Sequence, residues 1–562
     1  MPVVLLVLVV GVVWAVRRRQ GGERARSAEV GAVGWAPGTN WRVLAPLARA
    51  DARRLARHPA FVAGVVLTPL MFSAAMGGAR SWWQRSPSMA LALVPLGWCT
   101  IVAANLLALK PRRAGVDELF AAAPAPQPLR TTALLAGGSV AVAAAVALSA
   151  GWLLWSAATL DGAVGSPRLA EIGAGVLIVA GALAVGVAVA RWLPHFAFGL
   201  LAVFAVTFLQ ARFMDPTTWP WNTAQAHPGR FLGFLASTTS AGVAALEFRP
   251  AGWHAAYLAG LVLLMAAVAL ARDGVPRPLA AVFAAAAVLV ASTGWVQTRP
   301  PSDRRVAAMA AYLTDPRSSQ RCTESGLTTY CAYEEHRDQV AGWTVQVEAV
   351  RALLPPAVAG RRLAVTDRVP TVTGNSACGP KPYLDGVHRE VAAAVAPAAV
   401  WPEDGQVHPG TDRSACGGLK HDDLFTALQV GSWAVGLPPG PHGLDIRCDA
   451  AGQARAVVAL WLAGVATPDG ARFLRDVAGA EGSGPLTFAG WSDPPMLGAV
   501  FHADDVRRAV ALLDLPVERV RAVLHEHWAE LTDPATPSSA VSLAVSPAGT
   551  DPPAPPSPHA CR

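Results

Sequence analysis

The cysteines of this 562-residue chain are the side chains whose positions first indicate a chemistry. Six of the seven cysteines lie beyond residue 320. Disulfide bonds form in oxidising compartments outside the cytosol, so we expect this part of the chain to face outward. Cys322 and Cys331 enclose a Ser-Gly turn, which predicts a disulfide hairpin. Cys378 and Cys416 both stand in a Ser-Ala-Cys-Gly sequence and are the second predicted pair.

Residues that could support catalysis do not form a recognised pattern. His525 and His527 are two positions apart and would point to different faces of a helix, unlike the pair in a His-Glu-x-x-His zinc site. The sequence Gly-Trp-Ser-Asp-Pro at 490–494 lacks the final glycine of a nucleophile elbow. No G-x-x-x-x-G-K-[ST] phosphate loop occurs, so any ATP hydrolysis must come from a separate subunit.

Two further groups of polar residues also have simpler interpretations. His336 follows Glu334 and Glu335, and we interpret the three as a solvated charge cluster. A metal site is a less favoured alternative for three residues close in sequence, namely Cys416, His421 and Asp422. We therefore expect no catalytic residue, no metal and no cofactor in this chain.

Arginines recur at helical spacing in residues 41–57. On a helix, four apolar side chains share one face, Leu44, Leu47, Ala48 and Leu55. Four arginines fall on the opposite face, Arg42, Arg49, Arg53 and Arg57. This pattern predicts a basic amphipathic helix on the inner leaflet, with its arginines near anionic headgroups and with Pro46 kinking it or setting its start. The alternative is a charge cluster that only fixes membrane topology.

A second basic stretch lies at residues 110–130. It can form a short helix from about Gly115 to Ala123, ended by Pro124. The residues that could dock a cytosolic partner there are Arg112, Arg113, Asp117, Glu118, Leu119 and Phe120. The alternative is that this stretch only connects two membrane spans.

Eight stretches are apolar and almost free of charge, which predicts an all-α polytopic membrane protein with about eight transmembrane helices. Crossing about 30 Å of hydrocarbon takes roughly 20 apolar residues in a helix. The stretches cover residues 1–16, 58–79, 86–109, 131–160, 172–190, 192–211, 250–271 and 278–302. In the first stretch the arginines follow the apolar residues, which favours an uncleaved anchor over a signal peptide. An upstream start is the other interpretation.

The distribution of charge predicts the orientation of these spans. With the N-terminus outside, the inner loops hold 17 Lys and Arg and the outer loops hold 6, as the positive-inside rule requires. Residues 1–298 carry a net charge of +13 and residues 299–562 carry −6. The basic excess therefore belongs to membrane loops, and we exclude nucleic acid as a partner although the pI is about 9.3. Both termini are then extracytoplasmic in a multi-pass protein of the cell membrane.

The chain divides into four parts on this basis. Residues 1–57 hold the anchor and the amphipathic helix, 58–298 a transmembrane domain, 299–532 an extracytoplasmic α+β, mostly helical, domain, and 533–562 a proline-rich disordered tail. Apolar periodicity predicts outer-domain helices at 343–354, 504–513 with an Asp504 cap, and 516–531. The apolar segment 231–246 is too short to span and predicts a re-entrant or interfacial helix.

The order of these elements resembles the membrane subunit of type-2 ABC exporters of high-GC bacteria over residues 41–275. That family has an in-plane helix, two spans, a cytosolic loop helix, three spans, a re-entrant segment and a last span. The matching sequences are Arg54-Leu-Ala-Arg-His-Pro-Ala60, Arg113-Ala-Gly-Val-Asp-Glu-Leu-Phe120, Arg130-Thr-Thr and Arg191-Trp-Leu-Pro-His195. The resemblance implies that residues 112–123 are the coupling helix that receives force from an ATPase. It also implies partners, namely the lipid bilayer, a separate ATP-binding subunit, and a homo- or heterodimer of permease subunits.

Two functions follow as hypotheses. The first is the permease subunit of an ATP-driven exporter without its own ATPase. The spans lack mid-membrane Asp, Glu, Lys and Arg, which argues against an ion-coupled carrier. The second is a membrane-anchored extracytoplasmic binding or sensing protein of the cell envelope, in which the spans only hold residues 299–532 outside.

Overall fold

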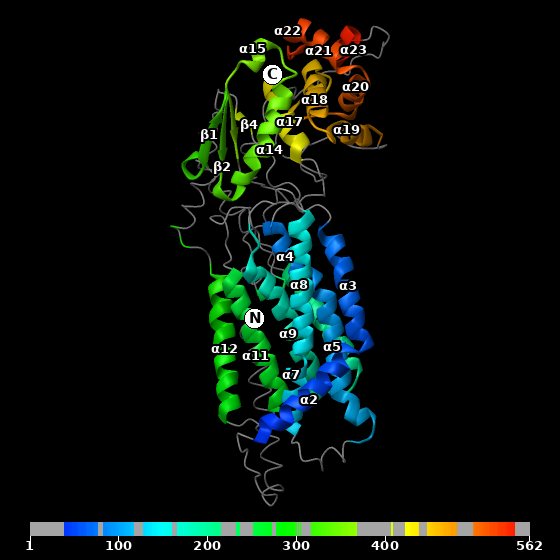
Figure 1. Ribbon diagram of the computed structural model, residues 1–562, viewed down its shortest axis with the longest axis vertical. Coiled ribbons are helices and arrows are strands. Elements are labelled where there is room, and N and C mark those ends of the chain that lie inside the picture. The colour runs from blue at the N-terminus through cyan, green and yellow to red at the C-terminus, as the bar shows by residue number, and fades with distance from the viewer. Residues whose placement is uncertain are drawn as a thin grey trace, which may run out of the picture.

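The fold is seen in a computed structural model of the chain (Figure 1). The structure describes residues 39–76, 82–116, 127–159, 166–214, 232–235, 251–272, 277–299, 302, 304, 316–367, 406–407, 422–437, 447–479 and 498–545. A helical bundle forms one end of the long axis and a C-terminal domain forms the other.

Ten helices of the described chain build the bundle. They are α2 (Thr39–Ala56), α3 (Pro59–Met76), α4 (Trp82–Ala92), α5 (Val94–Arg113), α7 (Gln127–Gly137), α8 (Ser139–Thr159), α9 (Leu169–Trp192), α10 (Ala197–Met214), α11 (Ala251–Ala271) and α12 (Arg277–Thr298). Helix α2 lies at the end of the bundle farthest from the C-terminal domain (Figure 1). We call that end the basic end and the opposite end the domain end.

The bundle holds apolar helices compatible with a membrane-embedded protein, and the described residues contain five or six of the eight predicted spans. Five described helices are long and apolar enough to cross a bilayer, and they are Ser88–Arg113, Gln127–Ala158, Leu169–Trp192, Ala251–Ala271 and Pro278–Thr298. A sixth is reached if the bent pair Trp41–Ala56 and Pro59–Ser73 counts as one span. Ala197–Gln210 is a shorter apolar helix, and residues 1–16 lie outside the described part.

The helices of the C-terminal domain surround two small sheets. The helices are α14 (Val340–Arg351), α15 (Pro356–Ala359), α17 (Asp422–Ala434), α18 (Ala454–Ala466), α19 (Gly470–Gly479), α20 (Ala503–Leu513), α21 (Val517–Glu526), α22 (Trp528–Leu531) and α23 (Ser538–Val545), with 3₁₀ turns η4 (Pro316–Ser319) and η5 (Glu334–Gln339). The strands are β1 (Arg321–Ser325), β2 (Thr328–Ala332), β3 (Leu363–Thr366), β4 (Gln406–Val407), β5 (Arg447–Asp449) and β6 (Gly498–Val500). The domain is therefore mostly helical with some strand, as the sequence predicts.

The larger sheet has the strand order β1-β2-β3-β4. Strands β1 and β2 form an antiparallel hairpin, and Gly326 in its turn has φ +58°, which glycine adopts without strain. Strands β2, β3 and β4 are parallel, and α14 and α15 cross over between β2 and β3. The carboxyl ends of β2 and β3 consequently meet at one edge of this sheet. Strands β5 and β6 form the second, parallel sheet.

Helix α18 forms the centre of the C-terminal domain. All its side chains from Ala454 to Gly464 are buried, and at 13 residues it is too short to span a membrane, so it is a core helix. It contains a buried cation, Arg455, whose Nε donates to Gln453 Oε1 at 2.7 Å and whose Nη1 donates to Gly436 O at 3.0 Å. These bonds offset part of the cost of burying its charge.

The predicted helices of this domain are found with altered ends. Helix α14 covers most of 343–354, and the stretch 516–531 is divided into α21 and α22 at His527. Helix α20 covers 504–513, but its N-cap residue is His502, so the prediction of an Asp504 cap is wrong. Asp504 lies in the first turn instead and pairs with Arg507 on the exposed face.

The structure differs from the predicted domain boundary at residue 532. Helix α23 places Val541 in the domain core. The amide of Ser538 donates to Gly452 O at 2.6 Å, and the amide of Ala454 donates to Thr536 O at 2.9 Å. The prolines of this region flank α23 rather than interrupt it, so composition alone assigned too much of the chain to the tail.

A buried carboxyl makes the stability of this domain depend on pH. Asp505 is fully buried in α20, and both its oxygens accept the Gly452 amide at 3.2 Å. Burial raises the pKa of Asp505 from 3.8 to about 6. The unfolded chain then releases this proton at lower pH than the folded chain. The contribution of Asp505 to the stability of the folded domain is therefore greatest below pH 3.8 and is lost as the pH rises through about 6.

We expect Asp505→Asn to remove this pH dependence, because an amide cannot ionise. Between pH 4 and pH 7, the free energy of unfolding of the wild-type domain should fall by about 2–3 kcal/mol relative to that of the variant. Amide hydrogen exchange of α18 in the full chain, corrected for intrinsic rates, measures this difference. Asp504→Asn is the matched exposed control and should keep the wild-type profile. Equal profiles for Asp505→Asn and wild type would contradict the prediction.

Candidate functional site

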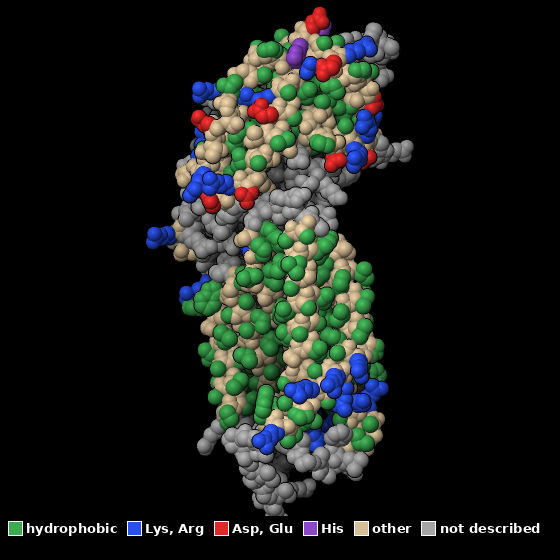
Figure 2. Space-filling model, in the orientation of Figure 1, with side chains coloured by type: hydrophobic (Ala, Val, Ile, Leu, Met, Phe, Trp, Pro, Cys, Tyr) green, Lys and Arg blue, Asp and Glu red, His purple; other side chains and the backbone are tan. Residues whose placement is uncertain are grey.

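Helix α2 covers most of residues 41–57. Arg42, Arg49 and Arg53 in this helix and Arg57 directly after it are all exposed. On the opposite face Leu55 is buried, while Leu44, Leu47 and Ala48 are half-buried. Basic side chains gather at the lower edge of the apolar band, at the end of the bundle where α2 lies (Figure 2). Pro46 lies inside the helix, so it does not set its start.

Helix α2 is seated on α7 at a glycine. A Cβ on Gly137 would lie 2.7 Å from the carbonyl oxygen of Ala48 and 3.0 Å from the amide nitrogen of Ala52. The backbones are therefore too close for any side chain at this position. Because α2 meets α3 at 60°, it crosses the basic end of the bundle rather than continuing α3. This geometry suits a helix that lies in the membrane surface.

The second predicted surface is only partly described. Arg112 and Arg113 are exposed in the last turn of α5, where cations interact favourably with the helix dipole. The helix is followed by Gly115 with φ +66°. Four of the predicted coupling residues lie outside the described part of the chain, and they are Asp117, Glu118, Leu119 and Phe120.

The sequence Arg191-Trp-Leu-Pro-His195 forms the break between α9 and α10 at the basic end. Trp192 Nε1 donates to Val268 O of α11 at 2.9 Å, and the Arg272 guanidinium lies 5.7 Å from the centre of the Trp192 ring. His195 Nδ1 accepts the Ala197 amide at 3.2 Å and caps α10. These contacts hold the ends of α9, α10 and α11 together at this level.

The described core of the bundle is nearly free of ionisable groups, as predicted. The buried charges, Arg85 of α4 and Glu171 in the first turn of α9, lie toward the domain end. The Arg85 Nη1 donates to Ser156 Oγ of α8 at 3.0 Å. At mid-bundle, Asn105 is fully buried beside Gly199 of α10, and its amide has no hydrogen-bond partner among the described residues.

Sequence reasoning missed a group of polar side chains at the domain end, which we call the domain-end polar cluster. It consists of Gln210, His254, Tyr257 and Gln297 around the backbone of Leu232–Leu235. The side chain of Gln210 in α10 makes two hydrogen bonds with the backbone of Leu235. Gln210 Nε2 donates to Leu235 O at 3.2 Å, and the Leu235 amide donates to Gln210 Oε1 at 3.0 Å. Tyr257 OH donates to Leu232 O at 3.3 Å.

The cluster packs part of the segment 231–246 against three helices. Of that segment only 232–235 is described, so the predicted re-entrant helix stays a prediction. The signal in the sequence was the presence of Gln210, His254 and Gln297 in otherwise apolar stretches. Polar side chains in such positions are costly unless hydrogen-bonded, and here they supply partners for a non-helical backbone.

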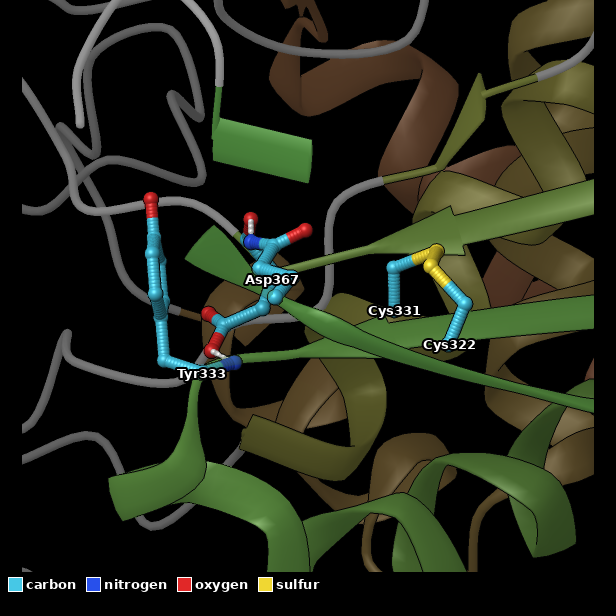
Figure 3. The surroundings of a disulfide bond; sticks show 5 residues. Cys322, Cys331, Tyr333 and Asp367 are labelled. Carbon is cyan, nitrogen blue, oxygen red and sulfur yellow. Dashed lines mark hydrogen bonds between the residues drawn. A yellow bond between two sulfur atoms is a disulfide. The ribbon is translucent and has the colours of Figure 1, made fainter. Parts of the chain in front are cut away.

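In the C-terminal domain the disulfide Cys322–Cys331 is confirmed. The two cysteines face each other across the β1–β2 hairpin (Figure 3). The bond closes a hairpin whose first strand is exposed along its whole length, so it fixes the register of an edge strand. The other predicted pair, Cys378 and Cys416, lies outside the described residues, as do Cys416 and His421 of the metal alternative.

The interpretation of His336 as part of a solvated cluster is wrong. His336 is 1% exposed, and its Nδ1 lies 2.7 Å from Oδ2 of Asp367, which is fully buried at the end of β3. The 3₁₀ turn η5 places residues three apart on one face, so His336 and Tyr333 both turn inward while Glu334 stays outside. The Tyr333 amide also donates to Asp367 Oδ2, at 3.3 Å (Figure 3).

This buried pair lies where parallel strands β2 and β3 end, the edge at which open α/β sheets bind ligands. Asp367 orients the imidazole through Nδ1. No group of three or more potential metal ligands occurs in the described ranges, and His525 bonds Leu353 O while His527 pairs with Glu530. The geometry offers a buried imidazole held in a fixed orientation.

Comparison with protein-family models, with curated proteins and with solved structures finds no match to this chain.

We expect Gly137→Val to detach α2 from α7, because a side chain there would collide with the α2 backbone. In lipid nanodiscs, tryptic cleavage after Arg49 and Arg53 should become about tenfold faster or more, since cleavage requires local unfolding of the helix. Gly151→Val in α8, where a Cβ meets nothing within 4 Å, is the matched control. An unchanged cleavage rate of the Gly137→Val variant would show that the contact between α2 and Gly137 does not hold α2 in place.

Proposed function

We propose that this chain is the membrane-spanning subunit of an ATP-driven exporter whose ATPase is a separate protein. The observation that carries the proposal is the arrangement at the basic end of the bundle. There an in-plane helix with four exposed arginines is seated on α7, and α5 ends in Lys110, Arg112 and Arg113 directly before residues 117–126.

The orientation of the bundle is part of the proposal. Lys and Arg favour the cytosolic side and disulfide bonds form outside. The basic end and the disulfide-bearing domain occupy opposite ends of the molecule (Figure 1). We infer that α2 lies on the inner leaflet and that the C-terminal domain is extracytoplasmic.

In this proposal an ATPase docks on residues 112–123. A force applied there reaches α5 and α7 directly, because the docking segment joins their ends. It reaches α2 through Gly137 and α9 through the packing of α5 against α9. The helices can then rock as a unit and alternate access for a substrate taken from the membrane or the cytosol. The apolar interior is compatible with an apolar or amphipathic substrate.

A second candidate is a membrane-anchored binding or sensing protein of the cell envelope. The pair His336 and Asp367 at the carboxyl ends of β2 and β3 favours it, because this edge is the usual ligand site of such sheets. Full ligand binding in the absence of any ATPase, with no substrate transported by vesicles, would favour this candidate over the first.

We expect affinity-tagged chain purified from its native membranes to retain an ATP-binding-cassette subunit, identified by mass spectrometry, and to show vanadate-sensitive ATP hydrolysis. Reversing the charge of both carboxylates, Asp117→Arg with Glu118→Arg, should reduce the bound ATPase by about tenfold or more, because like charges at a docking surface repel. The measurement is the ratio of the two subunits after purification.

Asp161→Arg, in the segment that joins α8 to α9, is the matched control and should leave this ratio unchanged. Transport that continues in vesicles without any ATP-binding subunit would refute the proposal.

A further inference from the structure

His254 is the one histidine of the domain-end polar cluster, and both its ring nitrogens are hydrogen-bonded. It is 1% exposed near the start of α11. Its Nδ1 lies 2.9 Å from Gln297 Oε1 of α12, and its Nε2 lies 3.2 Å from Phe234 O. One imidazole therefore joins three parts of the chain that are distant in sequence.

The identity of the two partners fixes the number of protons on the ring. The Phe234 carbonyl can only accept, so Nε2 must carry a proton. Gln297 Nε2 donates to the Thr293 carbonyl at 3.3 Å, which turns the amide oxygen toward His254. Turning the amide over would set its oxygen against the Thr293 oxygen. Nδ1 must then donate as well, and a ring that donates from both nitrogens is an imidazolium.

Helix α9 packs against α11, and its first turn holds a buried carboxylate. Glu171 is buried in the first turn of α9, one turn before Ala174, which packs with Tyr257 and Leu258 of α11. On α11 itself the neighbouring titratable group is Tyr257, whose ring centre lies 6.1 Å from that of His254. Among the other elements packed nearby, the described part of α10 contributes Gln210 and residues 232–235 have no titratable side chain. Directly after α12, Arg299 stacks on Trp295.

We propose that His254 is a proton-operated latch that holds α12 and residues 232–235 to α11. With two protons the ring makes both bonds. When it loses one proton, it must give up either Gln297 or Phe234, because a neutral ring has a single donor. Acidity at the domain end therefore closes the latch, and neutral pH opens one side of it.

The latch matters because, among the described residues, few contacts other than those with α11 hold α12 in place. Among the described helices its principal neighbour is α11, and most of its surface is open to the bilayer. Gly260 of α11 packs against Val290, and above that contact lies the His254–Gln297 bond. Helix α12 is the last described helix of the bundle before the C-terminal domain, so in this proposal the protonation of His254 affects how firmly that domain is attached to the bundle (Figure 1).

The test is hydrogen exchange of the full chain in lipid nanodiscs between pH 5 and pH 8, corrected for intrinsic rates. Peptides that contain 232–235 and 289–298 should be protected at low pH and lose about tenfold or more of that protection as the pH rises, since hydrogen bonds to a charged group are strong. Peptides from α5 should not respond. The imidazole ¹⁵N shifts of labelled protein should show a doubly protonated ring at low pH that is missing from His254→Gln.

Three variants make the test specific. His254→Gln cannot take up a proton and should give a pH-independent profile. Gln297→Glu places a carboxylate on Nδ1 and should move the loss of protection to higher pH. His195→Gln at the basic end is the control and should behave as wild type. A wild-type profile that is flat across this range, or one that His254→Gln leaves unchanged, overturns the latch.

If His254→Gln fails to fold, the test is the pH midpoint at which protection from hydrogen exchange is lost in wild type and in Gln297→Glu. Equal midpoints in these two proteins overturn the proposal. These readouts require neither an ATPase nor a transported substrate. The latch proposal can therefore fail while the exporter proposal stands, and the exporter proposal can fail while the latch proposal stands.

Discussion

The close approach of α9 to its neighbours determines how this bundle can assemble. In lipid the hydrophobic effect does not draw apolar helices together, so packing of small residues has to do so. A Cβ on Gly186 would lie 2.5 Å from Ile101 O of α5, and one on Gly175 would lie 3.1 Å from the Cα of Ala90 in α4. At these two levels the backbones themselves are in contact. The seat of α2 on Gly137 extends the same principle to the membrane surface.

Such packing leaves little room for large polar groups inside the bundle and moves them to its two ends. At the basic end, arginines point outward and polar contacts such as Trp192 to Val268 join helix termini. At the domain end, polar side chains point inward and hold backbone that is not helical. The two ends therefore differ in character, one a charged exterior and the other a hydrogen-bonded interior. This asymmetry is what a protein needs if it meets a cytosolic partner on one side and carries a folded domain on the other.

How much could be predicted from the sequence depended on the range of the interactions. The face of α2 and the apolar spans follow from local periodicity and length, and the hairpin disulfide from nearby cysteines, so these were found. The pairing of His336 with Asp367 joins the turn η5 to the residue after β3, which are distant in sequence, and local charge indicated a solvent-exposed position instead. The domain-end polar cluster likewise joins α10, α11 and α12, and single polar residues in apolar stretches did not reveal their partners. The short helix α23 escaped notice because its stability comes from burial of Val541 in the core rather than from its own sequence.

The extent of this packing bears on the choice between the two candidate functions. Holding a domain outside a cell requires one apolar helix, since a single transmembrane helix is already effectively irreversibly inserted. Here several helices pack closely at glycines, and an amphipathic helix packs against one of them. Of the five apolar helices in the described chain that are long enough to span a membrane, α12, the last before the C-terminal domain, is the least buried. A passive anchor would not require contacts among α2, α5, α7 and α9 that exclude even a methyl group. They are the contacts by which a displacement of the α5–α7 connection would reach the rest of the membrane domain, and for this reason we favour transport over anchoring.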